Sequence, residues 1–82
     1  MVRVDYEPRF KLIVQKTKDS TLLVKIKKQI SKIIENPKVG KPMRYGRKGT
    51  REVYIKPFRL SYLYAEDEDK IVFLDLYHKK QQ

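Results

Sequence analysis

Residues 51–77 read REVYIKPFRLSYLYAEDEDKIVFLDLY, and this stretch decides the fold. It contains runs rich in β-branched and aromatic residues, a composition that favours strands. These runs are Arg51–Lys56, Arg59–Ala65 and Ile71–Tyr77. The breaks between them, Pro57-Phe58 and residues 66–70, are short and carry proline or acidic side chains, as hairpin turns do. The stretch therefore predicts an antiparallel meander of strands.

Two helices are predicted upstream of the meander. Pro8 fits a first helical turn, where its missing N–H costs nothing, and apolar residues follow at helical spacing to about Lys18. Asp19 and Ser20 offer N-cap oxygens to a second amphipathic helix, which ends at Asn36-Pro37. The link between the helices is so short that they must form an antiparallel hairpin.

A short strand is predicted before the first helix, because Val2, Val4 and Tyr6 alternate with polar residues. The resulting order is β-α-α-β-β-β. This order predicts an α+β fold in which a helical hairpin packs on one face of a small antiparallel sheet. We interpret residues 1–82 as a single domain, because a chain of this length builds one thin core.

Strand alternation assigns side chains to the two faces of the predicted sheet. If Ile55 and Leu60 face the helices, then Tyr54, Lys56 and Arg59 lie together on the opposite face. A basic sheet face that carries a tyrosine is a suitable platform for a phosphodiester.

The composition points to an anionic partner and to chemistry without a cofactor. The net charge is +10, and residues 41–60 hold seven Lys and Arg against the single acid Glu52. Nucleic acid is the commonest partner of so basic a chain. With no cysteine and only one histidine, thiolate zinc and His-rich metal sites are excluded, so we expect neither cofactor nor metal.

No segment predicts a membrane protein. Apolar runs stay far below the ~20 residues that span a bilayer, and residues 1–7 are charged where a signal peptide is apolar. We therefore expect a cytoplasmic protein without a membrane partner.

The loop of residues 38–49 and the residues that follow it are rich in Lys and Arg, and Tyr45 and Tyr54 lie among these basic residues. Cations next to aromatic rings suit single-stranded RNA, where phosphates meet charges and splayed bases stack. The candidate RNA-binding residues are Arg44, Arg47, Lys48, Arg51, Lys56 and Lys79. For any one of them a solvated surface position is the alternative.

Four local strings, in order, resemble the RelE/ParE toxin superfamily of type II toxin-antitoxin systems, and RelE- and YoeB-type toxins in particular. They are Ile34-Glu35-Asn36-Pro37, Gly40-Lys41-Pro42, Phe58-Arg59-Leu60-Ser61-Tyr62 and Leu76-Tyr77-His78-Lys79-Lys80. The resemblance covers nearly the whole chain.

The resemblance implies a toxin that inhibits translation, an mRNA interferase. Such an endoribonuclease enters the ribosomal A site and cleaves mRNA there without a metal. The implied partner is a cognate RelB-like antitoxin, acidic and partly disordered, in a heterodimer or heterotetramer. Cleavage by attack of a 2′-OH on phosphorus needs a base, cations for the growing charge and an acid for the 5′-oxygen.

The resemblance also assigns candidate catalytic residues. Arg59 matches the family's strand arginine, whose guanidinium suits phosphate. Lys80 falls where RelE proteins carry a second basic catalytic residue. His78 follows a tyrosine as the histidine of YoeB-type relatives does, and an imidazole can transfer a proton near neutral pH. Tyr54 completes the set of candidates.

This chain departs from both family patterns at the residues that would act as the general base. The two strand lysines of RelE fall on Glu52 and Tyr54, and the YoeB carboxylate falls on Met43. The tyrosine on which RelE stacks an mRNA base has no counterpart up to Gln82. We therefore expect Tyr54, Tyr77 or Glu52 to substitute as the base, or the activity to be weak.

Two other functions fit the same sequence. ParE-type proteins share the fold but poison a topoisomerase by protein contact, and the loss of the strand lysines favours this reading. Retention of Arg59 and His78 favours the nuclease. A non-catalytic RNA-binding protein would need only the basic loop.

Overall fold

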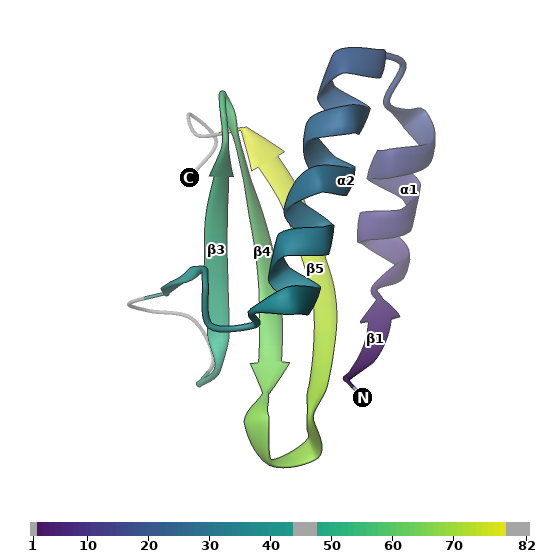
Figure 1. The fold of residues 1–82 in the computed structure, drawn as a ribbon. Coiled ribbons are helices and arrows are strands. Elements are labelled where there is room, and N and C mark those ends of the chain that lie inside the picture. The colour runs from purple at the N-terminus through teal and green to yellow at the C-terminus, as the bar shows by residue number, and fades with distance from the viewer. Residues whose placement is uncertain (1, 44–47, 79–82) are drawn as a thin grey trace.

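The protein forms two helices and a five-stranded sheet in a computed structural model that describes residues 2–43 and 48–78. Figure 1 shows the helical hairpin beside the strands. The helices are α1 (Pro8–Lys16) and α2 (Ser20–Glu35). The strands are β1 (Arg3–Tyr6), β2 (Lys41–Pro42), β3 (Thr50–Ile55), β4 (Phe58–Ala65) and β5 (Lys70–His78). A single 3₁₀ turn, η1 (Glu66–Glu68), joins β4 to β5.

The strand order across the sheet is β1-β5-β4-β3-β2. The predicted α+β fold and the antiparallel meander β3-β4-β5 are confirmed. The prediction of a wholly antiparallel sheet is wrong in one respect, because β1 pairs with β5 in parallel. The two helices separate β1 from the meander, and a long connection of this kind allows parallel pairing, whereas the short turns of the meander allow only antiparallel pairing. The two-residue strand β2 is too short to leave a periodic signal in the sequence.

The helix boundaries follow from local capping. The Asp19 carboxylate accepts hydrogen bonds from the backbone N–H groups of Thr21 and Leu22, which confirms the predicted N-cap of α2. Helix α1 ends two residues earlier than predicted, because Thr17 is already extended and its hydroxyl donates to the Ile13 carbonyl.

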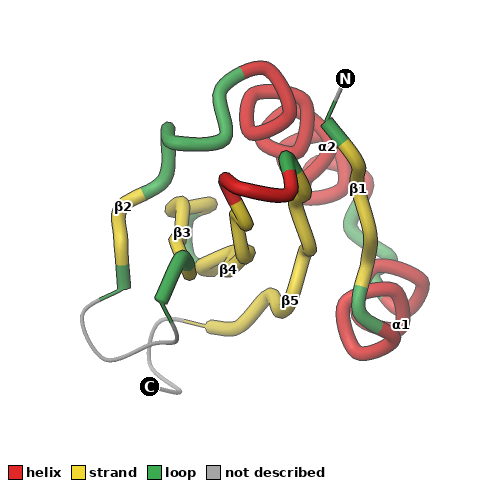
Figure 2. The backbone as a smooth tube through the Cα atoms, turned by 90° about the horizontal axis from the view of Figure 1, so that it is seen from below, coloured by secondary structure: helices red, strands yellow, loops and turns green. Residues whose placement is uncertain are grey.

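The helices lie along one side of the sheet, as Figure 2 shows from below. The core fills the space between them and the sheet. The buried apolar residues are Phe10, Ile26, Ile33, Ile55, Leu60, Tyr62, Ile71, Phe73 and Leu76. The predicted inward positions of Ile55 and Leu60 are therefore confirmed.

An irregularity in β5 keeps this core continuous. Ser61 pairs with Asp75 and Tyr62 pairs with Phe73, so Leu74 is an extra residue in β5. Without that bulge, simple alternation would turn either Phe73 or Leu76 away from the helices.

Neither helix of the described part is long and apolar enough to cross a bilayer.

Candidate active site on the open face of the sheet

Three strands align a row of polar side chains on the face that points away from the helices. Arg59 on β4 pairs with Tyr54 on β3 and with Tyr77 on β5. Directly paired residues of antiparallel strands project from the same face, with Cβ atoms about 5 Å apart. The predicted grouping of Arg59 with Tyr54 is thus confirmed, and Tyr54 is 52% exposed.

Glu52 joins two members of this row. Its Oε1 accepts a hydrogen bond of 2.7 Å from Arg59 Nη1, and its Oε2 accepts one of 2.8 Å from the Tyr77 hydroxyl. The Arg59 and Glu52 side chains are only 28% and 19% exposed. Of the three residues that the sequence left open as the base, Glu52 and Tyr77 therefore contact each other, and Glu52 also contacts Arg59.

Arg59 retains one unused donor. Its Nε–H is the only buried side-chain N or O atom without a hydrogen-bond partner in the part of the chain that the structure describes. Buried donors are rarely left unpaired, because the lost hydration costs about 1–3 kcal/mol. The guanidinium therefore retains one donor for which the described residues supply no acceptor.

His78 does not lie on this face. It pairs with Phe58 and follows Tyr77 in an alternating strand, so its side chain points to the side of the sheet opposite Arg59. Its ring meets the Phe58 ring edge-on, with centroids 5.5 Å apart. The structure thus separates His78 from Arg59, although the sequence placed both in one site.

The predicted basic residues are distributed over several places. Arg44, Arg47, Lys79 and Lys80 lie outside the described residues, as does Tyr45. Lys56 is exposed in the turn between β3 and β4, close in the chain to Arg59. Lys48 is exposed at the other end of the sheet, beside the start of β3.

Arg51 serves the architecture of the α2–β2 loop. Its Nη1 donates to the carbonyls of Gly40 at 2.7 Å and of Lys38 at 3.2 Å. At least one end of its guanidinium is thus used on the protein's own backbone, so its availability to RNA is reduced.

Tyr62 forms a second tie to the same loop, which no sequence pattern indicated. Its buried hydroxyl donates to the Pro37 carbonyl at 2.8 Å and accepts from the Gly40 N–H at 2.9 Å. Burial raises the pKa of this hydroxyl, and the Gly40 hydrogen bond and the charge of Arg51 oppose the shift. The proton is therefore held more tightly in the folded state, so the associated stability is complete below pH ~10 and is lost as the pH rises above it.

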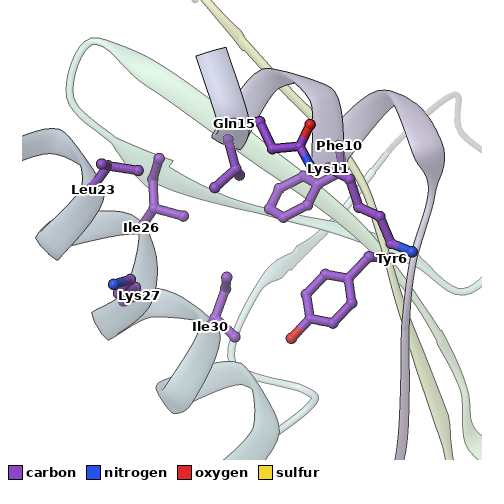
Figure 3. Close-up of a pocket in the computed structure, with 9 residues that line it drawn as sticks. Tyr6, Phe10, Lys11, Gln15, Leu23, Ile26, Lys27 and Ile30 are labelled. Carbon is purple, nitrogen blue, oxygen red and sulfur yellow. The ribbon is translucent and has the colours of Figure 1, made fainter. Parts of the chain in front are cut away.

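An apolar groove of about 300 Å³ lies between α1, α2 and the end of β1. Figure 3 shows its floor of aliphatic and aromatic side chains, with Lys11 and Lys27 beside them. The apolar lining consists of Tyr6, Phe10, Val14, Leu23, Ile26 and Ile30. Both lysines are exposed, so the groove is apolar within and positive at its edge.

Among residues 2–43 and 48–78, no cluster of His, Asp and Glu side chains could hold a metal ion. The candidate site of the described chain consists of the carboxylate, guanidinium and phenol groups on the open face.

Comparison with a family model places the whole fold in a known group. The model described as "ParE toxin of type II toxin-antitoxin system, parDE" matches residues 4–82. The chain matches no curated protein sequence at a significant level.

Comparison with solved structures shows the same fold in toxin–antitoxin complexes. The E. coli RelBE complex matches with a TM-score of 0.80 and 17% identity, over 95% of this chain and 96% of that one. The complex RelBE2 of Mycobacterium tuberculosis matches with a TM-score of 0.76 and 22% identity, over 95% and 98%. The archaeal RelE-RelB complex of Pyrococcus horikoshii OT3 gives 0.77 and 11%, over 99% and 98%. At such identities the likeness establishes the fold alone.

Proposed function

We propose that this chain, which belongs to the ParE toxin family of type II toxin-antitoxin systems within the RelE/ParE superfamily, is a toxin that cleaves mRNA in the ribosomal A site. It would act in the cytoplasm without a metal, as an endoribonuclease that stops translation. Arg59 would hold the scissile phosphate on the open face of the sheet.

One observation carries this proposal, the unpartnered Nε–H of Arg59 on the face that the helices leave uncovered. A guanidinium binds phosphate best when two N–H groups meet two oxygens. Arg59 Nη1 is bonded to Glu52, and the buried Nε–H still lacks an acceptor among the described residues. A phosphate oxygen would supply the missing acceptor.

The surroundings of Arg59 suit an unstacked RNA strand. Tyr54 and Tyr77 flank it in register, and the half-exposed ring of Tyr54 can stack on a splayed base. Lys56 adds a positive charge at the same end of β3. Of the basic residues outside the described part, Arg44, Arg47 and Lys79 remain candidates for contacts with the strand, and Lys80 remains a candidate catalytic residue.

The test is to add the purified toxin to a translation reaction and to map cuts in a reporter mRNA by primer extension. We expect new 5′ ends within translated codons, carrying a 5′-OH, and no cuts when ribosomes are omitted. An mRNA that stays intact while translation proceeds normally would contradict the proposal.

A ParE-like action on a topoisomerase is the second candidate. It is favoured by the matching family model. It is also favoured by Glu52, whose carboxylate contacts Arg59 and which stands at a position where RelE toxins have a lysine. The same protein preparation is therefore added to a supercoiling reaction with DNA gyrase. Gyrase inhibition with intact mRNA would select this candidate.

We further propose that a cognate antitoxin binds the toxin, because similar structures are toxin-antitoxin complexes. The apolar groove between α1 and α2, with Lys11 and Lys27 at its edge, fits an acidic amphipathic segment of such a partner. The segment would fold on binding, in a heterodimer or a heterotetramer.

Reversing both edge charges should weaken the antitoxin complex. For Lys11→Glu with Lys27→Glu we expect about tenfold lower affinity, measured by calorimetry with the cognate antitoxin. The control is Lys16→Glu with Lys25→Glu, which makes the same charge change at exposed helix positions outside the groove lining. Equal losses in both variants would mean that only net charge matters and that the groove is not the docking site.

His78 can be tested as a catalytic residue in the same translation assay. We expect His78→Ala to lose less than about tenfold in cleavage rate, below the 10²- to 10⁴-fold range of an essential acid or base, because the ring lies on the other side of the sheet from Arg59. A loss as large as that of an Arg59 variant would return the histidine to the site.

A further inference from the structure

Glu52 is a carboxylate on the open face that accepts hydrogen bonds from two other strands. It lies on β3, and its two oxygens receive a guanidinium N–H from β4 and a phenol O–H from β5. Its side chain is 19% exposed, so the carboxylate is largely buried but remains accessible to water. Lys41 pairs with it in β2, and no ion pair between the two is found in the described chain.

The carboxylate of Asp75, on the same strand as Tyr77, is already committed to other contacts. Asp75 Oδ1 accepts the N–H of Leu76 at 2.8 Å and the Nε of Arg9 at 3.2 Å. It belongs to the next pair along the sheet, opposite Ser61. Glu52 is therefore the carboxylate placed to act beside Arg59.

The contact between Arg59 and Glu52 is incomplete for such a pair. A carboxylate and a guanidinium can form two parallel hydrogen bonds, but here Glu52 uses one oxygen on Arg59 and gives the other to Tyr77. Among residues 2–43 and 48–78, the Nε–H of Arg59 consequently has no acceptor. A phosphodiester has two non-bridging oxygens and could satisfy the guanidinium better than Glu52 does, so a bound phosphate would displace Glu52 from Arg59 but not from Tyr77.

From this geometry we infer that Glu52 is the general base of the cleavage reaction, held against Arg59 in the free protein and released toward the 2′-OH when phosphate takes its place. The inference rests on the proposed nuclease function and names the base that the family pattern does not supply in this chain. Tyr77, hydrogen-bonded to Glu52, is the matching acid.

The reaction balances with these two groups. Glu52 takes the proton of the 2′-OH while the 2′-oxygen bonds to phosphorus and the bond from phosphorus to the 5′-oxygen breaks. The 5′-oxygen leaves with the hydroxyl proton of Tyr77. Glu52 then returns its proton to Tyr77 across their hydrogen bond, which restores both groups. The products are a 2′,3′-cyclic phosphate and a 5′-OH, and no redox partner or metal is consumed.

The first measurement is the cleavage rate of a translated mRNA by three variants. Glu52→Gln keeps the shape but cannot take a proton, so we expect a loss of at least about 10²-fold. Glu52→Asp keeps the base on a shorter stem and should recover part of that loss. Glu66→Gln is the matched control, because it makes the same change in net charge at an exposed residue of η1 and should cleave as the wild type does.

The second measurement separates chemistry from binding. It uses a short single-stranded RNA with 2′-O-methyl groups, which cannot be cleaved, and fluorescence anisotropy. Because the neutral amide competes less well for Arg59, Glu52→Gln should bind this RNA about fivefold more tightly than Glu66→Gln, as expected for loss of a partly exposed ion pair. Adding Arg59→Ala to Glu52→Gln should remove the gain.

The outcomes distinguish the inference from the function on which it rests. Cleavage by Glu52→Gln within about threefold of the active wild type overturns the inference, and so does a loss of cleavage accompanied by weaker RNA binding, which would indicate a structural role. A wild type that cuts no mRNA in the same assay overturns the proposed function instead.

Discussion

Replacing Arg59 by alanine is expected to abolish growth inhibition and to slow mRNA cleavage by at least about 10²-fold, because it removes a donor aimed at the charge that builds on the phosphate oxygens. Arg59 lies in the middle of the open face, because its strand β4 pairs with β3 on one side and with β5 on the other. Its guanidinium donates a hydrogen bond to Glu52. The rate is measured by primer extension on a translated mRNA at equal toxin concentration.

Two further variants show whether the Arg59 effect is specific. Arg3→Ala changes the net charge equally at an exposed position of the edge strand β1, and it should cleave normally. Arg59→Lys keeps the charge but not the planar fork, so it should recover only part of the rate. Full cleavage activity of Arg59→Ala, in a protein with an unchanged melting temperature, would remove Arg59 from the site and with it the assignment of the reaction to the open face.

The pairing of Arg59 with Tyr54 could be predicted from the sequence because it depends on local rules. The two residues lie on strands joined by a tight turn, so alternation on each strand and the turn position together determine the shared face. The same rules place Ile55 and Leu60 in the core.

The contact of Glu52 with Tyr77 could not be predicted in this way. Tyr77 lies beyond a bulge in β5, and its position relative to Glu52 depends on the register of two strand pairs. A one-residue error in either register reverses the face. For the same reason His78 could be read from its string as a partner of Arg59 although the fold directs it to the other side.

Three of the four strings that carry the family resemblance are joined by the hydrogen bonds of one side chain. The Tyr62 hydroxyl joins the Pro37 carbonyl of the first string to the Gly40 N–H of the second, and Tyr62 itself ends the third. These residues support the α2–β2 loop and not the chemistry. Pro37, Gly40 and Tyr62 therefore support membership of the superfamily, but these three residues do not distinguish its nucleases from its topoisomerase poisons.

Gly40→Ala should accordingly be among the most destabilising small substitutions in the chain. A Cβ at residue 40 would lie 2.5 Å from the Tyr62 hydroxyl, 2.8 Å from its Cε1 and 3.0 Å from the Glu52 carbonyl oxygen. The Gly40 backbone does not need a positive φ, so the penalty comes from this overlap alone. We expect the free energy of unfolding to fall by about 2–3 kcal/mol, a large share of the stability of a small domain. Urea denaturation followed by circular dichroism measures it.

The mechanism of that loss is tested by combining it with a change in Tyr62. Tyr62→Phe removes the hydroxyl and leaves the Pro37 carbonyl and the Gly40 N–H without their partner, at about 2 kcal/mol. In the double variant the shortest overlap is gone, so the combined loss should fall short of the sum of the single losses by about 1 kcal/mol. Val39→Ala, at an exposed residue of the same loop, should change stability by less than about 0.5 kcal/mol. Strictly additive losses for Gly40 and Tyr62 would show that the two do not meet, and that the family strings are joined by some other contact.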